Sequence, residues 1–149
     1  MDEKTKKDQR DELLIWVKQQ LDAAVSELIK KGYFGGMLVE AKPAWVHPFQ
    51  VLIGKVRERD RPKAFDWLIC GDVPTDLVDS SVASTPREAA RYFAMKWQLE
   101  VARYDDLSGQ ITIRPVPDLR QPGKQLEETA EALYELADDK QYWRQQEEF

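Results

Sequence analysis

The side chains best suited to chemistry in this chain follow a strand-like run. The stretch GDVPTD, residues 71–76, carries Asp72 and Asp76. Carboxylates at the end of a strand are suited to holding Mg²⁺ or to acid–base catalysis, and His47, the only histidine, could assist them. One hypothesis is therefore a small ligand-binding domain or enzyme with its pocket between residues 45–49 and 71–76.

The same stretch has a structural explanation as a turn. Gly71 permits backbone angles that other residues avoid, and Pro74 presets the second position of a turn. Asp72 and Asp76 are then expected to accept hydrogen bonds from neighbouring main-chain N–H groups. We favour this interpretation and assign no catalytic residue.

The sequence lacks the residues that the common kinds of metal and cofactor site require. With one cysteine, Cys70, and one histidine, a single chain cannot build a His/Cys zinc site, and no calcium-loop spacing occurs. Gly35 and Gly36 precede a strand-like run rather than a helix, and no Walker, dinucleotide or G-x-S-x-G pattern is present. We expect neither a metal nor a cofactor, and we expect Cys70 to be an inert residue of an apolar strand.

Aromatic residues in unusual places point to an interaction surface. Trp45 and Phe49 lie in PAWVHPF, a segment bounded by prolines that cannot join a central strand. Tyr142 and Trp143 follow the last predicted helix. Each pair either packs on the chain's own core or contacts a partner, since aromatic residues are enriched at interfaces.

The charge pattern limits the kind of partner. A net charge of −5 argues against duplex DNA and against an anionic membrane. A basic patch of Arg57, Arg59 and Arg61 at a predicted hairpin tip could dock an acidic protein or single-stranded RNA, although charged tips also keep sheet ends soluble. No aromatic residue is interleaved among these charges, so we do not expect nucleic acid to bind there.

Apolar periodicity and capping residues predict three helices. The first spans residues 8–31 and ends at Gly32. The second begins at Thr85 and Pro86, where a capping box coincides with a proline at the first helical position. The third spans about residues 124–138 and has an acidic outer face.

Strand-like runs predict a small antiparallel sheet. Residues 50–58 and 64–70 form a hairpin around a polar turn, residues 37–41 form a third short strand, and residues 110–116 are a candidate fourth. The predicted fold is α+β, with about three antiparallel strands and two to three helices in a two-layer single domain.

Composition predicts one domain over residues 1–149, with residues 1–7 flexible and residues 105–123 an irregular, proline-rich connection to the last helix. The start of the sequence lacks the apolar core of a signal peptide, and the longest apolar run, LLIWV, is too short to cross a bilayer. A single cysteine excludes an intrachain disulfide. We expect a cytoplasmic protein.

Residues 64–101 resemble a family of small bacterial proteins known only as a domain of unknown function. The resemblance rests on a strand end of the form W-x-[IV]-x-G-D-[LV]-P-T-D and on a following R-E-A…F…W-Q-L helix, here Trp67 to Asp76, Arg87-Glu88-Ala89, Phe93 and Trp97-Gln98-Leu99. It implies a bacterial, cytosolic source and brings no activity, substrate or cofactor.

Two functional hypotheses stay open. We favour a non-enzymatic protein-interaction or chaperone-like module that binds an unknown protein or itself as a homodimer, because recognisable catalytic sets are absent while aromatic segments and an acidic helix are present. The alternative is the pocket described above, which requires His47, Asp72 and Asp76 to converge within about 10 Å.

Overall fold

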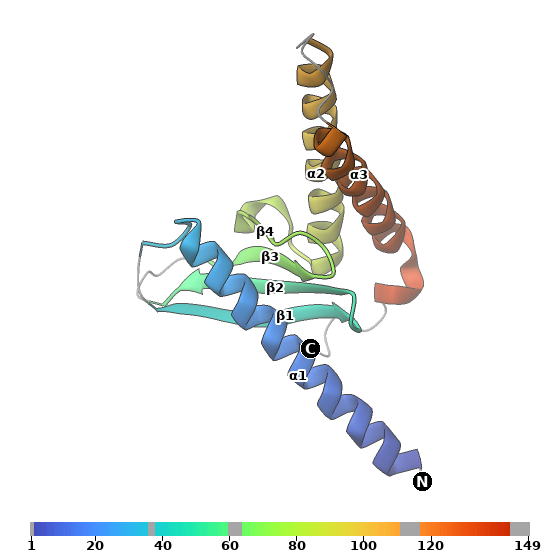
Figure 1. Ribbon diagram of the computed structural model, residues 1–149. Helices are drawn as coiled ribbons and strands as arrows, with labels where there is room; N and C mark the ends of the chain where they lie inside the picture. Colours follow the sequence, from blue (N-terminus) through green and yellow to red (C-terminus); the bar gives the residue numbers. More distant parts are fainter. Residues whose placement is uncertain (1, 36–37, 60–63, 111–116, 144–149) are drawn as a thin grey trace. The chain divides into compact units, whose positions relative to one another are not determined.

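The chain folds into long helices and a small antiparallel sheet (Figure 1). The computed structural model describes residues 2–35, 38–59, 64–110 and 117–143. Within these ranges the order of elements is one helix, four strands and two further helices, with short 3-10 turns after the last strand and after the last helix. This is the α+β class that the sequence predicts. The chain divides into two compact units, Met1–Pro86 and Arg87–Arg144.

Helix α1 (Asp2–Lys30) begins before its predicted start at residue 8. Residues 2–7, expected to be flexible, are helical because they contain no proline or glycine and carry acidic residues near the positive end of the helix dipole. The helix ends near the predicted position. The N–H of Tyr33 donates to the carbonyl of Leu28 at 3.1 Å across Gly32, whose φ of 83° favours glycine.

The sheet has its described strands in the order β1-β2-β3-β4, each antiparallel to its neighbours. Their bounds are β1 Val39–His47, β2 Val51–Glu58, β3 Asp66–Gly71 and β4 Asp76–Val78. The β2–β3 hairpin confirms the predicted one. The fourth strand is β4, and the candidate strand at 110–116 lies, apart from Gln110, outside the described residues.

Strand β1 is longer than the predicted run at 37–41 and includes Pro43. The strand continues past residue 41 and through Pro43 because β1 lies at the edge of the sheet, where a missing N–H on the outer side costs no ladder hydrogen bond. A shift in register between Pro43 and Trp45 accommodates the ring. The strand then continues to His47.

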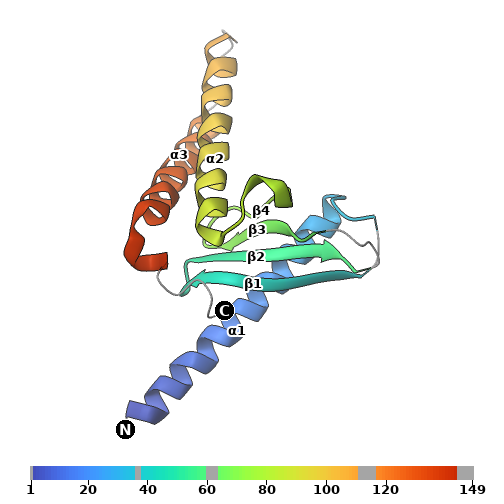
Figure 2. The same cartoon turned by 180° about the vertical axis from the view of Figure 1, so that it is seen from behind.

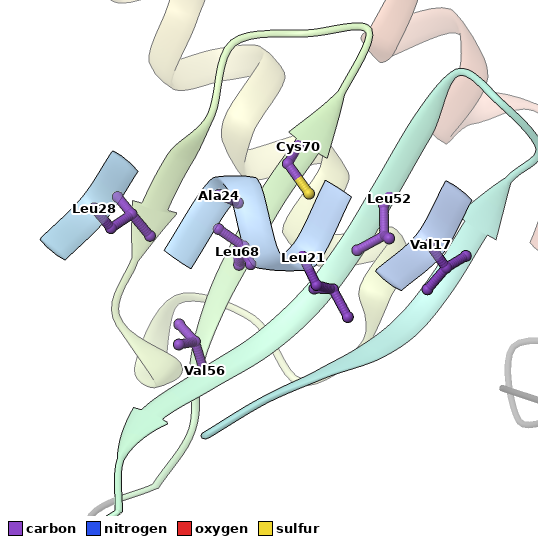
Figure 3. Close-up of a cluster of buried hydrophobic side chains, with 8 residues drawn as sticks. All are labelled: Val17, Leu21, Ala24, Leu28, Leu52, Val56, Leu68 and Cys70. Carbon is purple, nitrogen blue, oxygen red and sulfur yellow. The ribbon is translucent and has the colours of Figure 1, made fainter. Parts of the chain in front are cut away.

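Helix α1 packs across one face of this sheet (Figures 1 and 3). Buried side chains of the helix meet buried side chains of β2 and β3 in one cluster, formed by Val17, Leu21, Ala24 and Leu28 with Leu52, Val56, Leu68 and Cys70. Cys70 is thus a core residue, as expected. Burial raises the pKa of its thiol to about 12, so the sulfur stays protonated and unreactive at neutral pH.

The opposite face of the sheet is also buried along its middle. Ile53, Trp67 and Ile69 point to this side and are buried. The indole N–H of Trp67 donates to the carbonyl of Ala83 at 2.9 Å. This bond ties the segment after β4 back to the sheet.

The second unit consists of two antiparallel helices, α2 (Pro86–Gln110) and α3 (Pro117–Asp138), followed by a 3-10 turn at Lys140–Trp143 (Figure 2). Helix α2 begins at the predicted proline. Arg87 in its first turn donates from Nε to the carbonyl of Ala137 at 2.7 Å and from Nη2 to that of Asp138 at 3.2 Å. The start of α2 is therefore bound to the end of α3.

The irregular connection predicted over residues 105–123 is replaced by helix for most of its length. Helix α2 continues to Gln110 and α3 begins at Pro117, with residues 111–116 outside the described part. Pro117 stands at the first helical position, where its missing N–H costs no helix hydrogen bond.

Candidate functional site

An apolar groove of about 690 Å³ runs between α1 and the edge strand β1. Its walls combine one stripe of the helix with alternate residues of the strand: Leu14, Val17, Leu21, Val25 and Ile29 from α1, and Val39, Ala41 and Pro43 from β1, with Lys18, Asp22, Ser26 and Lys30 along the helix. Leu14 and Ile29 are 51% and 43% exposed, so large apolar side chains in this groove face solvent.

Within the described residues, no strand pairs with the outer side of β1, which borders this groove. The N–H of Arg59 donates to the carbonyl of Leu38 at 2.9 Å, which makes these two residues a hydrogen-bonded pair at the end of the β1–β2 ladder. Bonded and non-bonded pairs alternate in an antiparallel ladder, so the N–H and C=O groups of Val39 and Ala41 point away from β2. Pro43 adds only a carbonyl. No other described strand pairs with this edge.

Three basic side chains, Lys42, Lys55 and Arg57, lie on the face of the sheet opposite α1. We call this group of residues the cationic face. Lys42 Nζ lies 4.5 Å and Arg57 Cζ 4.2 Å from the centroid of the Phe65 ring. Lys55 Nζ lies 5.1 Å from that of Trp67. Each cation is thus held over an aromatic ring by cation–π attraction.

The cationic face contains two lysines that oppose each other on neighbouring strands, which is electrostatically unfavourable. Lys42 and Lys55 are direct cross-strand partners, and like charges in that position repel. Glu40 Oε2 accepts from Arg57 Nε at 3.1 Å, which compensates one positive charge. The edge of β1 therefore carries Glu40 and Lys42 side by side on this face, with a second lysine behind.

The predicted basic patch is only partly described. Arg57 belongs to the cationic face, Arg59 is exposed just after β2, and Arg61 lies outside the described residues. No aromatic residue is interleaved among these charges in the sequence, but the fold places the ring of Phe65 beneath Arg57. The sequence hides this contact, since Phe65 meets Arg57 only after the hairpin has formed.

The two predicted acids have different roles. The β1–β2 turn and the β3–β4 loop meet where the N–H of Asp72 donates to the carbonyl of Gln50 at 2.7 Å. Asp76 Oδ1 accepts from the N–H of Leu77 at 2.8 Å. The Asp72 carboxylate is exposed, and within the described part of the chain it has no hydrogen bond or ion pair. Only Asp76 therefore binds a main-chain amide as expected.

Two acids that the sequence analysis did not single out secure the segment after β4. Asp66 Oδ1 accepts from the N–H of Ser80 at 3.1 Å, and Asp79 Oδ2 accepts from that of Ser81 at 2.9 Å. An acidic side chain at the start of a helical turn commonly satisfies such a donor. The Asp-Ser-Ser sequence was the available signal.

The sheet keeps His47 apart from Asp76. The register runs from Trp45 through Ile53 and Ile69 to Asp76, so the histidine and this acid belong to opposite edge strands. Three strand spacings of about 4.8 Å separate those edges by about 14 Å. Burial lowers the pKa of His47, whose ring stacks on Trp45 at a centroid distance of 6.2 Å. Among the described residues no cluster of three His, Cys, Asp or Glu suited to a metal occurs.

Of the four aromatic residues that the sequence assigns either to the core or to a partner contact, two are buried. Trp45 lies in the interior, and so does Trp143, whose indole N–H donates to the carbonyl of Leu136 at 2.9 Å. The rings of these two residues pack inside the chain, which is the first of the two alternatives. Phe49 and Tyr142 are exposed.

The groove was missed at the level of sequence. Its only signals were the alternation of apolar residues with charges at the start of β1 and the proline at position 43, which marks an edge strand.

An α+β protein with an open-edged antiparallel sheet and a helix across one face is the class that these features define. The chain belongs to the family described as Domain of unknown function (DUF4826), whose model matches residues 9–143. Membership of an uncharacterised family is thereby confirmed. Comparisons with curated proteins and with solved structures gave no significant match. In the described residues, no helix combines the length and apolar character needed to cross a membrane.

Proposed function

We propose that this protein is an interaction module, which binds another protein or a second copy of itself through the groove between α1 and β1 and performs no catalysis. The observation that carries the proposal is the position of exposed apolar side chains, Leu14 and Ile29, beside an open sheet edge. Contiguous exposed apolar surface usually marks a binding site, and a sheet edge beside a groove suits an extended protein segment.

The alternative pocket around residues 45–49 and 71–76 has less support. Its histidine and one of its two acids lie on opposite edge strands. A cytoplasmic location in a bacterial cell also belongs to the proposal, and the buried, reduced thiol of Cys70, which needs no oxidising compartment, is consistent with it.

Photo-crosslinking tests this function. A photoreactive residue replaces Lys18 at the groove in the full chain, which is then irradiated in a lysate of its source cells. We expect reproducible adducts that disappear in Ile29→Lys, because a charge in the groove opposes apolar contact. Leu99→Lys is the matched control, since Leu99 is an apolar helix residue, 62% exposed, that does not line the groove.

The identity of the adduct and the state of the free protein complete the test. Mass spectrometry distinguishes a self-adduct from another protein, and light scattering measures self-association. A chain that stays monomeric at about 50 μM and forms no adduct sensitive to Ile29→Lys would overturn the proposed function, because protein partners of micromolar affinity associate at that concentration.

A further inference from the structure

The sequence along the open edge of β1 is complementary to itself. Residues 39–43 read Val-Glu-Ala-Lys-Pro, with apolar residues at alternate positions and one acid and one base between them. An antiparallel copy of this segment, centred on Ala41, places Glu40 of one chain opposite Lys42 of the other, twice, by symmetry.

The main-chain groups fit the same register. In β1 the N–H and C=O of Ala41 point to the open edge, so two Ala41 residues at the centre can exchange a pair of hydrogen bonds. Val39 can donate to the Pro43 carbonyl of the other copy. The reverse bond is absent because proline has no N–H. Pro43 thus ends the pairing without preventing it.

The side chains on the two faces also agree. Glu40 and Lys42 lie on the face opposite α1, where Lys42 is opposed by Lys55 within its own chain. A Glu40 from a second copy would supply the negative charge that this lysine pair lacks. On the other face, Val39 and Ala41 line the groove, so pairing brings the grooves of two copies to the same side of one continuous sheet.

We propose that the groove's partner is a second copy of this chain, joined by antiparallel β1–β1 pairing about Ala41 into a symmetric dimer with one continuous sheet. This deepens the proposed function, on which it rests. The dimer covers the exposed Leu14 and Ile29 of each chain with the facing helix of its partner, and reciprocal Glu40–Lys42 pairs set the register.

A pair of charge variants of the full chain gives the decisive test. Glu40→Lys leaves two lysines on the edge, and Lys42→Glu leaves two glutamates. Each variant alone would pair like charges, so we expect its dimer dissociation constant to rise about tenfold or more above that of the wild type. Mixed together, the two variants are complementary at both positions and should form a heterodimer about as tight as the wild-type dimer.

A proline variant tests the main-chain part. In Ala41→Pro the lost N–H is one that points away from β2, so the internal ladder is kept while the central intermolecular bonds are lost. We expect a folded monomer by circular dichroism and sedimentation velocity. Hydrogen exchange of the Val39 and Ala41 amides in the wild type should slow as protein concentration rises through the dimer dissociation constant.

The possible results distinguish failure of the dimer from failure of the proposed function. A wild type that is monomeric at about 200 μM overturns the dimer. So does a dimer indifferent to the charge variants, or a failure of the mixed variants to associate, and the charge pair decides the matter if Ala41→Pro does not fold. If self-association fails while crosslinks to another protein still depend on Ile29, the proposed function stands and only the identity of the partner is refuted.

Discussion

Replacing Gly71 by alanine should destabilise the fold by about 3 kcal/mol. Gly71 has a φ of 113°, a conformation that costs a residue with a side chain about 1–3 kcal/mol. A Cβ there would lie 2.6 Å from the carbonyl oxygen of Gln50, so the backbone must move. That same carbonyl accepts the Asp72 N–H at 2.7 Å, and loss of this bond adds about 1 kcal/mol. The reduced entropy of the unfolded alanine variant returns about 0.5 kcal/mol.

Two other glycines provide matched controls. Gly32 has a φ of 83° but nothing within 4 Å of an added Cβ, so Gly32→Ala should cost only the backbone strain, about 1 kcal/mol. Gly35 has neither feature, so Gly35→Ala should change stability by less than about 0.5 kcal/mol. Urea unfolding followed by tryptophan fluorescence measures all three, and Gly71→Ala should also lower Tm by about 10 °C. Equal effects at Gly71 and Gly32 would refute the close approach to Gln50.

Three further results are expected. Burial raises the pKa of the Cys70 thiol from 9.0 to about 12, so the stability that its protonated form contributes is complete below about pH 9 and is lost as pH rises towards 12. At pH 8 the thiol of the native protein should react with Ellman's reagent at least about 100-fold more slowly than the thiol of the unfolded chain. Equal rates would contradict the burial of Cys70. Arg87→Ala removes the hydrogen bond to the Ala137 carbonyl and should lower the free energy of unfolding in urea by about 1.5 kcal/mol. Arg87→Lys should recover less than half of this loss, because lysine lacks the planar guanidinium group. An alanine variant as stable as the wild type would argue against the link between α2 and α3. Phe49 has a φ of 62°, a strained angle for a residue with a side chain, and its ring lies 5.7 Å from that of Trp16. Both Phe49→Gly and Phe49→Ala remove the ring, but only glycine relieves the backbone strain, so the glycine variant should be about 1 kcal/mol more stable than the alanine variant. The reverse order would exclude strain at this turn.

The elements that could be predicted from sequence are those with local signals. The first and second helices follow from apolar spacing and from the residues at their ends, Gly32 and Pro86, and the β2–β3 hairpin follows from two strand-like runs around a polar turn. Strand β4 has only the span Asp76–Val78 and was not predicted, because so short a strand is defined by its pairing with β3 rather than by any pattern of its own.

The candidate site shows the same division. The acids after Gly71 were conspicuous by type, yet the strand register separates Asp76 from His47, and the Asp72 carboxylate is left exposed. Residue type shows which groups are able to react. Their convergence depends on strand order, which no local pattern encodes.

The sequence by itself determined the alternation of Val39, Glu40, Ala41, Lys42 and Pro43, and hence which side chains share a face, because successive residues of a strand point to opposite sides. Only the tertiary structure decided that this strand lies at the edge of the sheet, where its proline is tolerated and its outer amides pair with no described strand. Edge position depends on which strands pair with which, and that choice is made by the packing of the whole sheet against α1.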